Sequence, residues 1–260
     1  MTAPLGATLR DARARGRRLL VVYLMAGSTP TWAQTAAAVV AAGADAVEIG
    51  IAFSDPVLDG PVIQAAGTAA LAAGATLPVV TAELGALALG VPVVVMTYVN
   101  VALAHGYARS AGRLAAAGVT GAILADLPLE ELDAWRTVAR PAGIETVLLA
   151  APSTPPARLA RIGAETEGFC YAVGRMATTG ERATLDPGGE ALVRRLRDVT
   201  EAPVLLGIGV STPSQAAKAC GAADGVVVGS AVVRRMLEAE RPEGVGAFVA
   251  QLREAVDAAG

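Results

Sequence analysis

The sequence of 260 residues contains very few of the side chains on which several common mechanisms depend, with one histidine, His105, and one lysine, Lys218. A Ser-His-Asp triad or a multi-histidine zinc site would have to be built around His105 alone, which disfavours both. A Schiff-base mechanism would need Lys218, which lies in a predicted helix and is expected to face solvent. Acid–base chemistry therefore falls to carboxylates and tyrosines, without a metal or a cofactor.

Other absences exclude classes of partner. No apolar run reaches the roughly 18 residues that a membrane span needs. The net charge is −3 and the sequence has no basic block, so it predicts no basic surface that would bind nucleic acid or anionic lipid. The two cysteines, Cys170 and Cys220, have no metal-ligand neighbours, so buried reduced thiols are expected. The N-terminus does not follow the order of a signal peptide, and we expect a cytoplasmic protein.

What the sequence does contain is a regular alternation of strand-like and helical segments after an amphipathic N-terminal helix. The predicted strands are Leu19–Ala26, Asp45–Gly50, Val91–Thr97, Gly121–Ala125, Glu145–Ala150, Gly168–Val173, Pro203–Ile208 and Gly225–Val228. The predicted helices between and after them are Thr31–Ala42, Val62–Ala73, Leu77–Leu89, Gly106–Ala117, Glu130–Arg140, Pro155–Gly163, Gly189–Val199, Thr212–Gly221, Ala231–Met236 and Gly244–Ala259.

Eight such units predict a single-domain (β/α)8 TIM barrel over residues 1–260, with an extra N-terminal helix. Alternating strands and helices imply parallel pairing, and eight is the number of strands that closes such a barrel. A doubly wound open sheet is the second choice. Against it, the turn Ala26–Pro30 after the first strand lacks the glycine-rich dinucleotide fingerprint.

The second predicted strand carries a carboxylate, Glu48, on the face opposite its large aliphatic residues. Val47 and Ile49 lie on one face by the two-residue period of a strand, and Glu48 lies on the other. If Val47 and Ile49 meet the helices, Glu48 points into the other buried layer near the carboxyl end of the strand. Burial without a cation raises the pKa of a carboxyl group, which suits a group that gives and takes a proton near neutral pH.

A second carboxylate, Asp59, lies in a segment that Pro56 and Gly60 mark as a loop before the next helix. In a barrel, active sites lie at the carboxyl ends of the strands, and Glu48 and Asp59 both belong to that end. The alternative is that Glu48 ends a strand at the surface and that Asp59 is an ordinary turn residue.

Glycines follow the last two predicted strands. Gly207 and Gly209 come after the seventh strand, and Gly229 precedes Ser230 at the start of a short helix. Glycines let the backbone approach an anion, and the N–H groups at a helix start favour negative charge, so these loops predict a phosphate site that needs no lysine or arginine. Tight turns are the alternative explanation. The long loop Gly174–Arg182 after the sixth strand is expected to be a mobile lid, or else a plain surface loop.

Taken together, these segments resemble the tryptophan synthase alpha subunit family. The specific part of the resemblance is Ala44–Gly50 followed by Phe53–Gln64, which carry both acids. It continues in order, over nearly the whole chain, through Thr97–Asn100, Ala125–Pro128, Thr178–Gly180, Gly207–Gly209 and Gly229–Ser230.

The resemblance implies a lyase of tryptophan biosynthesis that cleaves indole-3-glycerol phosphate to indole and glyceraldehyde 3-phosphate by a cofactor-free retro-aldol reaction. By this analogy Glu48 is the general acid–base, and Asp59 holds the indole N–H and stabilises positive charge on the ring. Tyr171 matches a position close to Glu48 and is the third catalytic candidate. A carbon–carbon cleavage without lysine or metal needs another electron sink, and a protonated indole ring is one.

The resemblance also implies a set of substrate contacts. The phosphate-binding positions of the family match Gly180, Gly209, Gly229 and Ser230, and its lid threonine, which contacts the Asp59 equivalent on closure, matches Thr179. The full expected set of substrate- and phosphate-binding residues is Tyr23, Tyr98, Thr179, Gly180, Ile208, Gly209, Gly229 and Ser230.

Members of the family typically form an α2β2 assembly and pass indole to a pyridoxal-phosphate β subunit, which is the expected partner. This chain departs from the family at Gly27–Thr29, where Gly-Asp-Pro is usual, at Met25 in place of threonine, and at Ile208 in place of an aromatic residue. These departures affect the indole pocket and the coupling to a β subunit, and they leave open a stand-alone paralogue that supplies free or modified indole to secondary metabolism. Two further alternatives are a different phosphosugar barrel enzyme, disfavoured by the scarcity of lysine, and a non-catalytic activator of a β subunit, disfavoured by the presence of both acids.

Overall fold

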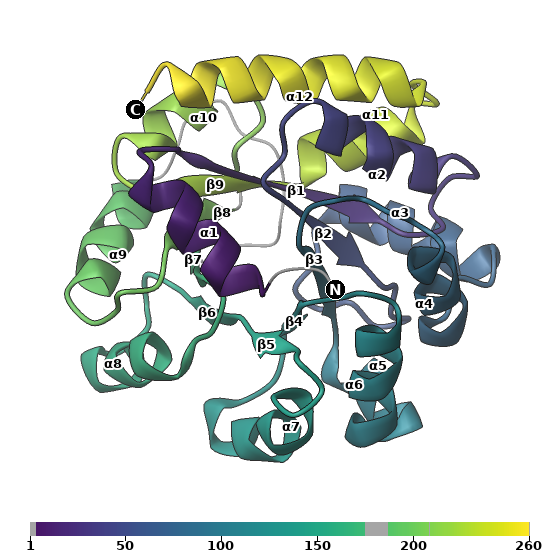
Figure 1. Ribbon diagram of the computed structural model, residues 1–260, viewed down its shortest axis with the longest axis horizontal. Helices are drawn as coiled ribbons and strands as arrows, with labels where there is room; N and C mark the ends of the chain where they lie inside the picture. Colours follow the sequence, from purple (N-terminus) through teal and green to yellow (C-terminus); the bar gives the residue numbers. More distant parts are fainter. Residues whose placement is uncertain (1–3, 175–186, 208, 260) are drawn as a thin grey trace.

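The computed structural model describes residues 4–174, 187–207 and 209–259, and its strands form one parallel sheet rolled into a barrel (Figure 1). The strands are β1 (Leu19–Met25), β2 (Ala46–Gly50), β3 (Val93–Thr97), β4 (Gly121–Leu124), β5 (Glu145–Thr146), β6 (Leu148–Ala150), β7 (Cys170–Val173), β8 (Val204–Gly207) and β9 (Gly225–Val228). Their order in the sheet is β5-β4-β3-β2-β1-β9-β8-β7-β6.

The sheet closes through a strand that is broken in the middle. Its two outer strands, β5 and β6, are separated in sequence by Val147 alone. β5 pairs with β4, and β6 pairs with β7, so the predicted strand Glu145–Ala150 is present but changes neighbour at Val147. The sheet therefore has eight strand positions, which confirms the predicted (β/α)8 barrel.

Helices surround the barrel on its outer side, and α1 lies across one end of it (Figure 1). They are α1 (Leu5–Ala14), α2 (Trp32–Ala41), α3 (Pro61–Ala72), α4 (Leu77–Gly85), α5 (Val99–His105), α6 (Tyr107–Ala116), α7 (Leu132–Ala139), α8 (Pro156–Glu165), α9 (Pro187–Arg197), α10 (Pro213–Cys220), α11 (Ser230–Leu237) and α12 (Pro242–Asp257), with a short 3-10 turn, η1 (Leu129–Glu131), before α7.

Two helices differ from the sequence-based expectation. α4 ends at Gly85, four residues before the predicted Leu89. α5 was not predicted at all; Gly106, with a φ of 79°, separates it from α6. Such a left-handed φ is accessible to glycine without strain, so the chain turns sharply there and begins a second helix.

The barrel interior is a separate apolar layer from the one beneath the outer helices. Its core contains Leu19, Val21, Ala46, Val94, Ile123, Val147, Phe169, Tyr171, Leu205 and Val227, and Leu5 and Leu9 of α1 pack against them. The backbone N–H of Gly6 donates to Glu145 Oε2 at 2.6 Å, which ties α1 to the amino end of the strands. α1 thus closes the bottom of the barrel and leaves the carboxyl ends of the strands for the site.

Cys170 and Cys220 are buried free thiols, and Lys218 is exposed on α10, as predicted. Within the described residues, no single helix is long and apolar enough to cross a membrane; α3 and α4 pass that test only as a pair, and they meet at an angle of 88°.

Candidate active site

Glu48 lies inside the barrel, as the strand periodicity predicted. Its neighbours Val47 and Ile49 pack in the outer apolar layer with the helices, whereas Ala46, on the same face as Glu48, belongs to the interior. In the register of the sheet, Glu48 lies between Tyr23 of β1 and Val94 of β3. Glu48 therefore projects into the barrel from a strand with neighbours on both sides, and only 1% of its surface is exposed.

The environment of Glu48 favours its protonated form. Burial raises the pKa of Glu48 to about 8, because an ionised carboxylate loses its hydration inside the barrel. Within the described residues, Glu48 Oε2 is buried without a hydrogen-bond partner. At neutral pH this group exchanges its proton readily in both directions, which is the property required of a general acid–base.

Asp59 lies on the loop that connects β2 to α3, at the mouth of the barrel. Burial raises the pKa of Asp59 to about 6, and an interaction with the Tyr98 hydroxyl lowers it in part. Asp59 is therefore mainly ionised at neutral pH, while Glu48 is mainly protonated. The site thus holds two carboxyl groups in different protonation states, which is the arrangement that lets two acids take separate roles.

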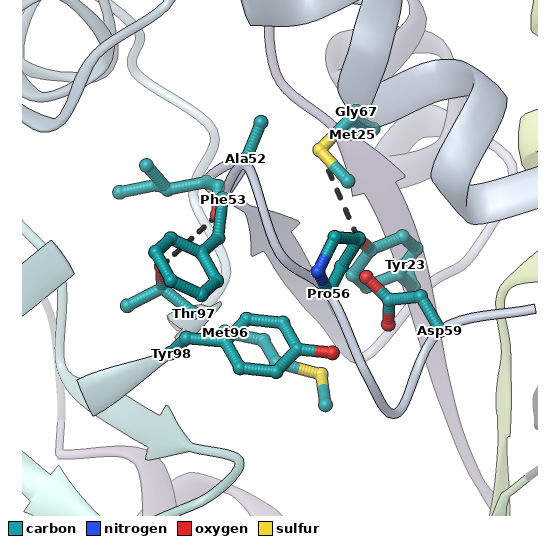
Figure 2. Close-up of a pocket in the computed structure, with 11 residues that line it drawn as sticks. Tyr23, Met25, Ala52, Phe53, Pro56, Asp59, Gly67, Met96, Thr97 and Tyr98 are labelled. Carbon is teal, nitrogen blue, oxygen red and sulfur yellow. Dashed lines mark hydrogen bonds between the residues drawn. The ribbon is translucent and has the colours of Figure 1, made fainter. Parts of the chain in front are cut away.

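Tyr98 connects the end of β3 to the loop that carries Asp59. Its hydroxyl accepts a hydrogen bond from the backbone N–H of Leu58 at 3.0 Å, and its ring packs against Phe53 with 5.2 Å between the ring centroids. In Figure 2 the Tyr98 hydroxyl points toward Asp59 across the pocket. Burial, followed by the nearby Asp59 charge, raises the pKa of Tyr98 to about 12, so the hydroxyl stays protonated and available as a donor.

Tyr23 and Tyr171 are buried inside the barrel mouth, each with its hydroxyl against a glycine of the neighbouring strand. A Cβ on Gly50 would lie 2.1 Å from the Tyr23 hydroxyl, and a Cβ on Gly207 would lie 2.3 Å from the Tyr171 hydroxyl. Burial and the nearby Glu48 charge hold the pKa of both tyrosines well above its usual value, with Asp59 also acting on Tyr23. Glycine at positions 50 and 207 thus lets both tyrosine rings approach the neighbouring strand this closely.

A hollow beside Asp59 contains residues that the sequence analysis did not assign to the site (Figure 2). It is lined by Tyr23, Met25, Ile51, Ala52, Phe53, Pro56, Asp59, Gly67, Met96, Thr97 and Tyr98. Met96 shares the inward face of β3 with Val94, so the strand period already predicted its direction. Gly67 comes from α3, and nothing in the local sequence connects it to Met25 on β1.

Three of the predicted phosphate-binding residues gather at the ends of adjacent strands. Gly209 follows β8, and Gly229 follows β9, which pairs with β8. Gly209 has a φ of 95°, and a Cβ there would meet no atom within 4 Å, so the backbone is open at this point. Ser230 is the first residue of α11, and the Gly229 carbonyl already accepts from the N–H groups of Val232 and Val233.

Several predicted residues lie outside the described part of the chain. They are Thr179, Gly180 and Ile208, together with the expected lid beyond Gly174. For the described ranges, no group of three or more histidine, cysteine, aspartate or glutamate side chains is placed to hold a metal ion. The described residues thus bring two carboxyl groups with raised pKa values to the mouth of the barrel, a pair suited to acid–base chemistry.

The chain is similar to known proteins along nearly its whole length. The family model for the tryptophan synthase alpha chain matches residues 9–258. The sequence is 47% identical to the tryptophan synthase alpha chain of Streptomyces coelicolor over 97% of this chain and 96% of the relative. It is 48% identical to that of Streptomyces avermitilis over 91% of this chain and 87% of the relative.

Solved structures show the same fold. A structure of Mycobacterium tuberculosis tryptophan synthase superimposes with a TM-score of 0.91 at 35% identity, covering 99% of both chains. The tryptophan synthase subunit alpha of Legionella pneumophila superimposes with a TM-score of 0.89 at 31% identity, covering 98% of both chains.

Proposed function

The chain belongs to the tryptophan synthase alpha chain family, and from that premise we propose that Glu48, Asp59 and Tyr171 carry out its reaction. The reaction is the cleavage of indole-3-glycerol phosphate to indole and glyceraldehyde 3-phosphate, a carbon–carbon lyase step of tryptophan biosynthesis. The observation that supports these roles is one barrel mouth with two carboxyl groups, one with a pKa of about 8 and one with a pKa of about 6.

Glu48 acts first as an acid and then as a base. In its protonated form it gives a proton to C3 of the indole ring, which turns the ring into an indoleninium cation. The resulting carboxylate then takes the proton of the glyceryl hydroxyl on the carbon bonded to C3. As that hydroxyl becomes a carbonyl, the bond to C3 breaks and its electron pair restores the C2–C3 double bond of indole. A group with a pKa near the working pH performs both transfers efficiently.

Asp59 stabilises the cation that forms between these two transfers. An ionised carboxylate that accepts the indole N–H is attracted more strongly as positive charge develops on that nitrogen, so it binds the transition state better than the substrate. Tyr98 holds the loop of Asp59 in place through Leu58. Tyr171 fills the mouth beside Glu48 and keeps water away from it, which preserves the raised pKa.

The phosphate is held by backbone groups. Gly209, Gly229 and the start of α11 at Ser230 offer N–H groups on the end of the barrel where Glu48 and Asp59 lie. A helix N-terminus carries partial positive charge, so it binds a phosphate without a lysine or an arginine. Tyr23, Thr179, Gly180 and Ile208 complete the proposed set of substrate contacts.

The partner of the chain is a pyridoxal-phosphate β subunit, as in the α2β2 assembly that is typical of the family. We place the protein in the cytoplasm, because a phosphorylated substrate does not cross a membrane unaided and the enzyme must share its compartment. The departures at Met25 and Ser28 keep a stand-alone role in indole supply as the second candidate.

One assay tests the reaction and separates the two candidates. The purified chain alone is given indole-3-glycerol phosphate, and indole and glyceraldehyde 3-phosphate are both measured. Fast release of both products in equal amounts supports a free-standing indole producer. Slow release that accelerates on addition of a cognate β subunit supports the α2β2 role. The absence of both products in the presence of the β subunit would refute the proposed activity.

A further inference from the structure

The hollow beside Asp59 has unused space next to the place proposed for the indole N–H. Its free volume is about 20 Å³, which is room for one water-sized group. Its walls are apolar apart from Asp59, Thr97 and the two tyrosine hydroxyls. The Thr97 hydroxyl donates to the Ile51 carbonyl at 3.0 Å, so its proton is not available to a ligand in the hollow.

The walls of this hollow are adaptable on two sides. Met25 and Met96 line it from β1 and β3, and methionine is unbranched, so it changes shape at little cost. The Tyr23 hydroxyl donates to the Met25 sulfur at 3.9 Å, a weak contact, and the rest of the Met25 side chain packs among apolar neighbours. Figure 2 shows Met25 beside Gly67 of α3, above the Tyr23 ring.

Gly67 supplies the space into which Met25 can move. A Cβ at position 67 would lie 3.9 Å from Met25 Cε and 3.9 Å from Ala52 Cβ. Without that Cβ, the Met25 methyl has a free position against the α3 backbone. A group that enters the hollow can therefore displace Met25 toward Gly67 without moving the strand or the helix.

The positions of Glu48 and Asp59 determine which edge of the indole ring faces the hollow. Of the ring carbons that can carry a substituent, C2 and C7 lie nearest to the N–H, one on each side of it. C2 adjoins C3, the carbon that must face Glu48, and the hollow is lined by Asp59 but not by Glu48. The hollow therefore faces C7.

We propose that this enzyme accepts indole-3-glycerol phosphates with a small apolar substituent, such as a methyl group or a chlorine atom, at ring position 7, and that Met25 and Gly67 determine this specificity. The inference rests on the proposed function, since it names a further class of substrate for the same site. A rigid pocket separates substrates that differ by one methyl group by about 10–200-fold. Here we expect the kcat/KM values of the parent and the 7-methyl substrate to lie within about 3-fold of each other.

The experiment compares both substrates in the wild-type chain and in two variants. Gly67→Ala fills the space behind Met25, and Met25→Leu replaces a mobile side chain with a branched one of similar volume. In both variants we expect the ratio of kcat/KM for the 7-methyl substrate to that for the parent to fall by about 10-fold. Gly67→Ala should fold well, because its new Cβ makes only ordinary contacts and alanine favours a helix.

Met236→Leu is the matched control. It replaces a buried methionine near the end of α11, outside the hollow, and should leave the ratio unchanged. A wild-type enzyme that cleaves the parent but discriminates against the 7-methyl substrate by more than about 10-fold would overturn the inference and leave the proposed function intact. Equal loss on both substrates in Gly67→Ala would also overturn it. If neither substrate is cleaved, even with a β subunit, the proposed function itself fails.

Discussion

The Tyr98 hydroxyl accepts a hydrogen bond from the backbone N–H of Leu58, and this bond fastens the loop of Asp59 to the end of β3. The two residues are 40 positions apart in sequence, so the position of Asp59, proposed as a catalytic residue, depends on a contact between two loops. The Tyr98 side chain is in this sense a positioning residue, and its removal should act through Asp59.

Tyr98→Phe should lower kcat/KM by about 10-fold, because a lost hydrogen bond of this kind is worth about 1–1.5 kcal/mol. Since the hydroxyl also lowers the pKa of Asp59, the acidic limb of the pH–rate profile should move to higher pH. Tyr107→Phe, on a tyrosine that packs edge-on to Trp135 outside the pocket, serves as the control. Where Asp59→Asn assigns the acidic limb to Asp59, a lower rate with an unmoved limb would mean that Tyr98 does not act on Asp59.

Glu48→Gln should abolish turnover while substrate binding remains nearly intact. The amide has the shape of the protonated acid but cannot exchange a proton, so the loss should be at least about 10³-fold in kcat. Binding is measured separately by titration with indole-3-glycerol phosphate, which the inactive variant does not consume. Turnover within about 10-fold of the wild type would remove Glu48 from the mechanism.

The pH dependence of kcat/KM should be bell-shaped, with limbs near pH 6 and pH 8. The rate falls below about 6 because Asp59 becomes protonated, and it falls above about 8 because Glu48 loses the proton that it must donate. The substrate phosphate also titrates near pH 6. Asp59→Asn separates the two causes: loss of the acidic limb in this slower variant assigns the limb to Asp59, and its persistence assigns it to the phosphate.

Gly50→Ala should disturb the site through Tyr23. The new Cβ would lie 2.1 Å from the Tyr23 hydroxyl oxygen and 2.6 Å from Cζ, so the ring must move. We expect a loss of stability of about 1–3 kcal/mol, typical of overpacking, together with reduced activity. The double variant Gly50→Ala/Tyr23→Phe lacks the closest colliding atom and should recover part of the stability in urea unfolding. Additive losses would mean that the two positions are not coupled.

The local part of this site was predictable from the sequence, because it depends on short-range periodicity. The alternation of Val47, Glu48 and Ile49 is fixed by the geometry of a strand, and it placed Glu48 inside the barrel correctly. The eight strand positions followed from the same periodicity. The break of one strand at Val147 did not, because it arises from a change of neighbour during closure of the sheet.

The remaining features depend on contacts between distant segments. Nothing near Leu58 indicates that Tyr98 binds its N–H, and nothing near Gly67 indicates that Met25 lies over it. The sequence predicted Gly207 as part of a phosphate loop. In the structure it also makes room for the Tyr171 ring from the neighbouring strand. Packing across the barrel sets such roles, and the sequence of a single segment does not predict that packing.

The raised pKa of Glu48 predicts that this proposed catalytic group destabilises the fold at neutral and alkaline pH. Its pKa rises from an ordinary value of 4.5 to about 8 in the folded chain, so the folded state binds this proton more tightly than the unfolded state. The stability that this group contributes is therefore fully present below about pH 4.5 and is lost as the pH rises through about 8.

Glu48→Gln removes this titration and should be more stable than the wild type, by an amount that grows with pH. Within the window the slope is about 1.4 kcal/mol per pH unit, so the difference between the two proteins should increase by about 2–3 kcal/mol from about pH 5.5 to about pH 7.5. Urea unfolding of both proteins at the two pH values measures it. Parallel stability curves would show that Glu48 titrates in the folded chain as it does in the unfolded one, and the acid–base role that depends on its raised pKa would lose its physical basis.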